Sequence, residues 1–211
     1  MAGDTRTAAK PGRLRAAISY ESGIWRSLFR WSFRRPPRME PGDEAFAYAA
    51  GVAPLIWVFI GISAVEIPIL HLLLPSTTLR LIALALGAWG LLWMLGMLAS
   101  MYEKPHIIGR SGVRIRYGLS VDYEISWDRI AEIRYHKRTL VKSRTVQLED
   151  STLHIAVNTQ TNVEIVLLEP MTLPVPKVGD CPVSTIRCYA DDQGAMISSA
   201  RAHLAAIGDQ P

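Results

Sequence analysis

Uncharged apolar residues fill two long blocks near the middle of the chain. The blocks span Gly51–Leu74 and Leu81–Met101, and together they contain one acidic residue, Glu66, and no Lys or Arg. As helices of about 24 and about 21 residues they would be roughly 36 and 31 Å long, enough to cross a bilayer core of about 30 Å. The turn-like link Pro75–Thr78 makes them antiparallel neighbours. The pattern predicts a membrane-spanning helical hairpin with helices 51–74 and 81–101.

From His106 onward the hydrophobic pattern changes to a period of two, which is typical of β-strands. Strands are predicted over 113–117, 121–127, 130–136, 146–149, 153–158, 163–168 and 184–189. Glu169–Pro182 contains four prolines and predicts a long loop. Asp191–Asp192 is expected to cap a closing helix, Gln193–Ile207, whose apolar face consists of Met196, Ala200, His203, Leu204 and Ile207.

The segment before the hairpin carries most of the excess positive charge. Residues 1–45 hold nine Lys or Arg and five Asp or Glu, whereas residues 102–211 hold thirteen of each sign. Residues 1–19 are expected to be a disordered basic tail, and 20–45 an interfacial amphipathic segment. Within it Arg26, Arg30 and Arg34 recur every four residues beside aromatic side chains, and Arg35 adds a further charge. These four arginines are candidate ligands of lipid headgroups; the alternative is a disordered juxtamembrane tail.

Charge also predicts how the hairpin is oriented. Lys and Arg residues are frequent before the first apolar block and after the second one, whereas the region that connects the two blocks has only Arg80. The positive-inside rule therefore places both termini in the cytoplasm and predicts a two-span protein of the cell membrane. The predicted parts are the tail 1–19, the interfacial segment 20–45, the hairpin 46–101 and a cytoplasmic domain 102–211. The electrically neutral domain argues against nucleic acid as a partner.

The presence of Glu66 in the hairpin needs an explanation, because an ionised carboxylate is costly inside a bilayer. His71 lies five residues further on, about 140° around the helix, so the two side chains do not share a face. Folding at Pro75–Thr78 places Glu66 level with Gly87, where close approach is possible. Two interpretations stay open: a protonated Glu66 bonded to backbone or to a second protomer, and a transport role.

A second basic cluster lies between two predicted strands. Its cations are Lys137, Arg138, Lys142 and Arg144, which could contact anionic headgroups or simply be solvated. The chain has no Gly-rich phosphate loop, GxSxG or HExxH motif, and neither its five His nor Cys181 and Cys188 have metal-ligand spacing. No catalytic residue, metal site or cofactor is predicted.

The stretches YEKPHIIGRSGVRIRYG and YEISWDRIAEIRYHKR resemble the bacterial PH-like domains found beside paired transmembrane helices in membrane proteins of uncharacterised function. The matching positions include Ile125, Trp127 and Ile130. The resemblance covers about residues 102–207 and the helix pair. It implies an α+β or mainly-β domain, a PH-like barrel of about seven antiparallel strands capped by a C-terminal helix. It also implies oligomeric or partner-binding roles, and it transfers no functional residue.

The sequence thus predicts a non-enzymatic integral membrane protein whose cytoplasmic PH-like domain mediates protein interaction or self-assembly at the membrane. Its expected partners are the anionic headgroups of the bilayer and either a second copy of the chain or another membrane protein. One alternative is a small transporter or channel subunit that uses Glu66. Another is a membrane-bound enzyme whose site has no recognisable motif.

Overall fold

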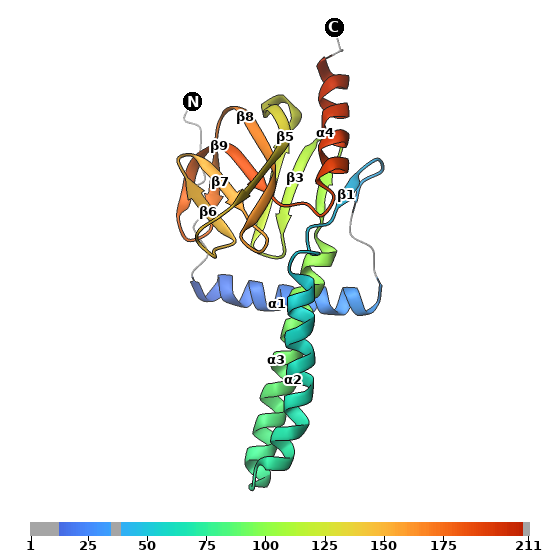
Figure 1. Cartoon of the computed structure of the whole chain (residues 1–211), viewed down its shortest axis with the longest axis vertical. Helices are drawn as coiled ribbons and strands as arrows, with labels where there is room; N and C mark the ends of the chain where they lie inside the picture. The colour runs from blue at the N-terminus through green and yellow to red at the C-terminus, as the bar shows by residue number, and fades with distance from the viewer. Residues whose placement is uncertain (1–12, 35–38, 209–211) are drawn as a thin grey trace, which may run out of the picture.

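The computed structural model describes residues 13–34 and 39–208 of the chain. Two long helices, α2 (Ala53–Leu73) and α3 (Thr77–Glu103), form a column, and a domain of β-strands stands at one end of it (Figure 1). Helix α1 (Arg13–Ser32) crosses beside the upper part of the column, below the β domain. Helix α4 (Gln193–Gly208) lies along one side of the β domain.

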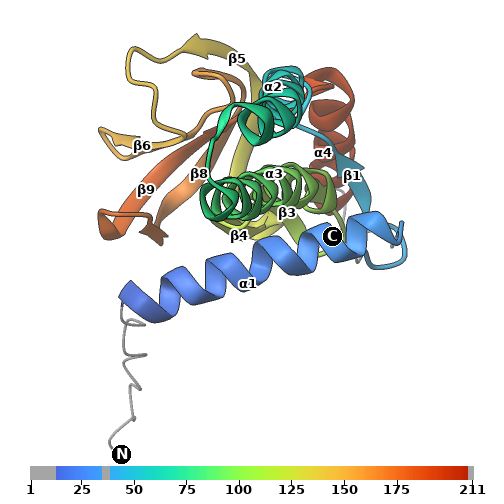
Figure 2. The ribbon, with the colours of Figure 1, turned by 90° about the horizontal axis from the view of Figure 1, so that it is seen from below.

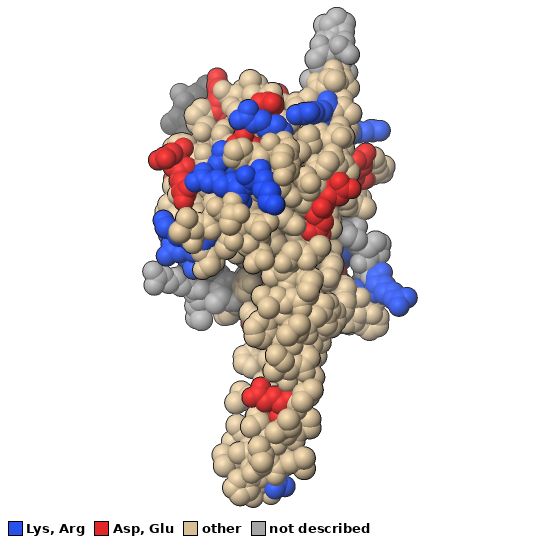
Figure 3. All heavy atoms as spheres, viewed as in Figure 1, with Lys and Arg blue, Asp and Glu red and all other residues tan. Residues whose placement is uncertain are grey.

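The prediction of two long apolar helices is confirmed. Both α2 and α3 are long and apolar enough to cross a membrane. Large apolar side chains such as Phe59, Leu72 and Leu86 are exposed on them, and the column is almost free of charged atoms (Figure 3). Helix α3 extends beyond the predicted 81–101 at both ends, because no proline interrupts it between Ser76 and Pro105.

Helix α1 begins earlier than predicted. Residues 13–19, which were expected in a disordered tail, are helical, because Leu, Arg and Ala in this stretch are good helix formers and extend the helix that follows. The rest of that tail, residues 1–12, lies outside the described residues. In the view from below, α1 passes beside α3, on the side away from α2 (Figure 2).

Three contacts attach α1 to α3. Ile24 is fully buried and occupies the space left by the missing side chain of Gly96: a Cβ atom there would lie 2.5 Å from Cγ2 of Ile24. Trp93 donates from Nε1 to the Glu21 carboxylate at 3.2 Å, and Arg30 donates from Nε to Glu103 at 3.0 Å. These contacts, called the α1 clamp below, hold the helix across the end of the column.

The β domain consists of two open sheets. Sheet A has the order β1 (Glu44–Phe46), β2 (His106–Ile108), β3 (Gly112–Tyr117) and β4 (Val121–Ser126), all antiparallel. Sheet B has the order β5 (Ile130–Thr139), β8 (Gln160–Val175), β9 (Gly179–Cys188), β7 (Thr152–Ile155) and β6 (Val146–Glu149), antiparallel except for the parallel pair β7–β9.

The predicted barrel of about seven antiparallel strands is therefore wrong in its strand count and its closure. The described residues form nine strands. A 3₁₀ turn, Trp127–Arg129, ends the second predicted strand early and moves the chain from sheet A to sheet B. Phe46, which was expected to begin the hairpin, instead ends β1 and is buried in the domain core. Strand β1 is too short for its alternation to be recognised in the sequence.

The proline-rich segment 169–182 is not a loop. It forms the ends of β8 and β9, where Leu173 pairs with Cys181 and Val175 with Gly179. These end segments of β8 and β9 form a two-stranded ribbon. Neither β5 nor β7 pairs with the ribbon, so each of its two strands has one edge without a partner strand. Proline is tolerated at such edges because its missing N–H leaves no inter-strand hydrogen bond unmade.

The two sheets enclose one hydrophobic core, which α4 closes. Trp127 donates from Nε1 to the Gly109 carbonyl at 3.0 Å, and its ring stacks on His203 of α4 with centroids 5.2 Å apart. Asp192 caps α4 by accepting from the Ala195 N–H at 2.9 Å, as predicted. The fully buried large side chains of the core include Ile108, Ile115, Ile125, Leu153, Ile165, Ile186 and Met196.

Asp191 does not share the capping role predicted for the Asp191–Asp192 pair. Its carboxylate accepts from the Ala50 N–H at 3.1 and 3.2 Å, and its own N–H donates to the Ala47 carbonyl at 2.8 Å. Tyr48, which lies between these two residues, accepts from the Gly118 N–H at 2.6 Å. These bonds tie the segment that leads into α2 to the β domain, so the domain has direct attachments to both α1 and α2.

We expect Gly96→Ala to loosen the α1 clamp by about 1–3 kcal/mol, because the added methyl group collides with Ile24 and approaches its carbonyl oxygen. Hydrogen exchange of α1 amides in the detergent-solubilised protein measures the effect. Gly90→Ala is the matched control, since a Cβ there meets no atom within 4 Å. Equal protection of α1 in both variants would contradict the importance of the Gly96 contact.

Candidate membrane-surface site

Bulky apolar side chains are exposed on α1 and just after its end. Ile18, Phe29 and Phe33 are more than half exposed, and Trp31 is partly exposed. Helix α1 lies where the nearly uncharged column meets the charged β domain (Figures 1 and 3). Apolar and aromatic side chains beside arginines are typical of helices that lie in the headgroup layer of a membrane.

The four predicted headgroup arginines of this segment are not equivalent. Arg26 is exposed on α1, and Arg30 is half-buried in its ion pair with Glu103. Arg34 lies beyond the end of α1 with a φ of 49°, so it does not continue the helical face of Arg26 and Arg30 as predicted. The helix ends at Ser32, well before the end of the predicted interfacial segment 20–45. Arg35 lies outside the described residues.

The second basic cluster is divided between a strand and a loop. Lys137 and Arg138 belong to β5, and Arg138 donates to Glu149 at 3.1 Å. Lys142 and Arg144 are exposed in the following loop, where their carbonyls accept from Gln147 Nε2. Both loop cations share a cleft with Tyr117 and Ser120 at the β3–β4 turn.

The β3–β4 turn rests on α1, because Leu119 packs over Gly23: a Cβ at Gly23 would lie 2.8 Å from Leu119 Cδ1. Lys142 and Arg144 therefore lie at the end of the β domain that faces α1. Of the second basic cluster, Lys142 and Arg144 line this cleft, whereas Lys137 and Arg138 do not.

Glu66 and His71 are both exposed on the surface of α2. Glu66 borders a groove between the two helices together with Ser63, Ala83, Gly87 and Gly90. The expected proximity to Gly87 is present, but Ile67 occupies the space beside that glycine: a Cβ there would lie 2.7 Å from Ile67 Cγ1. Across residues 13–34 and 39–208, no hydrogen bond or ion pair is made by the Glu66 carboxyl group.

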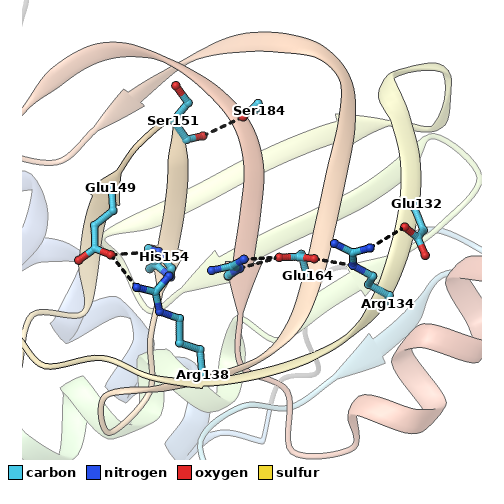
Figure 4. Close-up of polar contacts among 9 residues, drawn as sticks. Glu132, Arg134, Arg138, Glu149, Ser151, His154, Glu164 and Ser184 are labelled. Atoms are coloured by element: carbon cyan, nitrogen blue, oxygen red, sulfur yellow. Dashed lines mark hydrogen bonds and ion pairs between the residues drawn. The ribbon is translucent and has the colours of Figure 1, made fainter.

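A row of polar side chains crosses the outer face of sheet B (Figure 4). Its centre is Glu164 on β8, which is 1% exposed and accepts from Arg134 Nε at 2.6 Å and Arg187 Nε at 2.7 Å. Burial raises the pKa of Glu164, but the two guanidinium groups outweigh burial and leave that pKa below its ordinary value. Sequence alternation placed Glu164 in a strand but could not show its neighbours, which come from two other strands.

The β domain contains two buried histidines: His154 belongs to the polar row of sheet B, and His106 lies in sheet A. His154 is fully buried with its Nε2 3.9 Å from Glu149, and burial followed by nearby Arg138 lowers its pKa. His106, in sheet A, accepts from the Arg116 N–H at Nδ1 and lies 2.9 Å from the Tyr189 carbonyl at Nε2; burial lowers its pKa to about 4. Both rings are therefore neutral at physiological pH.

Three cations near α1 were not among the predicted site residues. They are Lys104, just after α3, and Arg114 and Arg116 on β3. Arg114 makes two hydrogen bonds to Asp122 on β4, at 2.6 and 2.8 Å. The alternation of arginines in β3 and acids in β4 was a usable signal for this pairing, but only the fold brings both strands to the end of α3. In the described part of the chain no cluster of three or more His, Cys, Asp or Glu could hold a metal ion.

No protein-family model, curated protein or solved structure matches the chain. The resemblance to bacterial PH-like domains consequently stays a prediction from the sequence.

We expect Glu164→Gln to lower the free energy of unfolding by about 1–3 kcal/mol at neutral pH, because two guanidinium groups lose their anion. A carboxylate with a depressed folded pKa stabilises above its unfolded pKa and loses that effect as pH falls through the folded value. The deficit of the variant should therefore shrink below about pH 4. Denaturant unfolding across pH measures it.

Glu132→Gln is the matched control on the same face. Glu132 is exposed and pairs with an exposed part of Arg134, so its loss should change stability by no more than about 0.5 kcal/mol. Equal deficits in the two variants would show that the buried position of Glu164 is not what makes its contacts strong.

Proposed function

We propose that the chain is a non-enzymatic integral membrane protein that assembles with a second copy, or with another membrane protein, and holds its β domain at the cytoplasmic face of the cell membrane. Two apolar helices of sufficient length and the exposed apolar side chains of α1 support the membrane location. The Lys and Arg distribution around the hairpin supports cytoplasmic termini.

The observation that carries the assembly proposal is the position of Glu66. Its side chain is exposed on the hairpin, and no group within the described ranges bonds to it. An uncovered carboxylate in the hydrocarbon layer costs several kcal/mol, and such residues normally face another helix. The adjoining groove is lined by the small residues Ala83 and Gly90, and a Cβ at Gly90 would meet no atom within 4 Å, so another helix can approach closely there. A second hairpin would cover Glu66 there.

Assembly of hairpins would also bring β domains together in a defined orientation. The α1 clamp fixes α1 on α3, Leu119 rests on α1, and the Asp191–Ala50 bonds fix the entry to α2. A domain attached to α1, which is itself held on α3, and to the segment that leads into α2 cannot turn freely when its hairpin finds a partner.

We propose that the β domain is PH-like in its general architecture. Support comes from its mostly antiparallel strands followed by a C-terminal helix, and from Ile125, Trp127 and Ile130, which are all buried in the core. The two open sheets and the parallel β7–β9 pair distinguish it from a simple seven-stranded barrel.

A transport role is the second candidate, and the same uncovered Glu66 favours it. A carboxyl group that faces a groove in the membrane could exchange a proton or bind a cation. The groove offers little else for a polar path: apart from Glu66, its polar side chains are Ser63 and the Trp93 indole N–H, which is bonded to Glu21.

We expect Thr77→Cys to react with a membrane-impermeant thiol reagent on intact cells, in a chain where Cys181 is replaced by Ser. Ser111→Cys, which is equally exposed but lies in the β domain, should react only after permeabilisation. Labelling of Ser111→Cys from outside would reverse the proposed orientation.

We expect Glu66→Leu to weaken self-association about fivefold, because a hydrogen bond between membrane helices contributes about 1 kcal/mol. Glu66→Gln should associate like the native chain, since the amide still donates and accepts. Förster transfer between labelled chains in liposomes measures the association, and proton or cation flux is recorded in the same preparations.

Leu72→Ala is the matched control, since Leu72 is exposed on the same helix six residues away and on another face. Association that is unchanged in Glu66→Leu would contradict assembly through Glu66. A native flux that Glu66→Gln abolishes, with stability unchanged, would replace the assembly proposal by the transporter.

A further inference from the structure

A pocket of about 380 Å³ lies where α1, the end of α3 and sheet A meet. Five cations line it: Arg26 and Arg30 from α1, Lys104 after α3, and Arg114 and Arg116 from β3. Its two carboxylates are Glu103 and Asp122. This junction pocket is formed by three parts of the chain that are far apart in the sequence, and it carries a clear excess of positive charge.

The carboxylates of the junction pocket are already engaged. Glu103 accepts from Arg30, and Asp122 accepts two hydrogen bonds from Arg114. Arg26 and Lys104, by contrast, make no hydrogen bond or ion pair with any group in the described parts of the chain. Two cations that face the same pocket are thus available to an anion from outside.

Arg116 gives an independent indication that the positive charge of the junction pocket is only partly compensated. The residue is 8% exposed, and its Nε is buried without a hydrogen-bond partner in the described chain. The same Nε forms an ion pair with Asp122 at 3.5 Å, but the Asp122 carboxylate is also hydrogen-bonded to Arg114. One carboxylate thus serves two guanidinium groups, and the Arg116 Nε–H is buried without a hydrogen bond to any described residue, which is costly. Burial lowers the pKa of both Lys104 and Arg116, with Asp122 acting against it, so both cations would gain from a further negative charge.

The junction pocket also lies at the height of the headgroups if the hairpin spans a bilayer. From Arg80 to Lys104 the helix rises roughly 36 Å, slightly more than a hydrocarbon core of about 30 Å. Arg80 would then be at one surface and Lys104 at the other. The exposed apolar side chains of α1 beside the pocket place this helix in the same layer.

We propose that the junction pocket binds the phosphate of an anionic phospholipid headgroup, with Arg26 and Lys104 donating to its oxygens and Arg116 facing it from the wall of sheet A. The proposal rests on the membrane location proposed above. A bound headgroup would connect α1, α3 and the β domain through one anion, and would make the attachment of the domain depend on the lipid composition of the membrane.

The test is native mass spectrometry of the full-length chain in detergent, titrated with phosphatidylglycerol. We expect the native chain to retain lipid. The double variant Arg26→Gln with Lys104→Gln should bind the lipid at least about tenfold more weakly, because each cation near an anionic headgroup raises the affinity severalfold. The single variant Arg26→Gln changes only an exposed helix position, so it reports the loss even if the double variant folds poorly.

Lys142→Gln with Arg144→Gln is the matched control, because it removes two exposed cations from the same end of the domain. Equal losses in the two double variants, or no loss in either, would overturn the junction pocket as the site. Displacement of the lipid by equimolar inorganic phosphate would overturn the lipid assignment in favour of a soluble phosphate. A chain that does not enter nanodiscs at all would contradict the proposed membrane location, whereas a chain that enters them without pocket-dependent lipid retention would contradict only this inference.

Discussion

Helix α1 can lie across α3 because Gly96 has no side chain and Ile24 fills that space. The arrangement of the rest of the molecule depends on this close contact. With α1 in place, Leu119 has a surface to rest on, Arg30 reaches Glu103, and Trp93 finds an acceptor in Glu21. Burial of one Ile side chain contributes about 1.5–3 kcal/mol. The hydrogen bonds of Glu21 and Arg30, which lie on either side of Ile24 along α1, then set the direction of the helix.

The α1 clamp brings cations from separate elements together. The column below α1 carries few charges, whereas charged residues are spread over the β domain (Figure 3). Five cations from α1, the end of α3 and sheet A line the junction pocket. A protein surrounded by water does not need to separate its charged and apolar residues in this way. A protein in a bilayer must place apolar side chains in the hydrocarbon core and can place cations at the level of the anionic headgroups. Glu66 is the exception within the apolar column. In the proposed membrane location, the cost of exposing its carboxyl group to lipid makes Glu66 the strongest single argument for a partner hairpin.

Sequence periodicity was informative wherever a strand alternates or a helix is uniformly apolar. It located the segments of β3, β4 and α4 closely, and the Asp192 cap was recognisable from the residue types alone. It failed for β1, which is too short to show a period, and for the proline-rich ribbon of β8 and β9, where unpaired strand edges tolerate residues that normally end strands. Trp127 was recognised as part of a motif, but that it closes the core against His203 could not be read from the sequence.

The sequence by itself determined the apolar hairpin, the excess of basic residues before it and a β domain after it, because hydrophobicity, charge and period are local properties of a chain. Only the tertiary structure decided which cations share a pocket. Lys104, Arg116 and Arg26 come from three separate elements, and their proximity depends on the α1 clamp and on the turn that Leu119 places over Gly23. The tertiary structure also showed that Arg30 is engaged by Glu103, whereas Glu66 has no partner in the described chain. Such pairings are set by long-range packing, which no local pattern records.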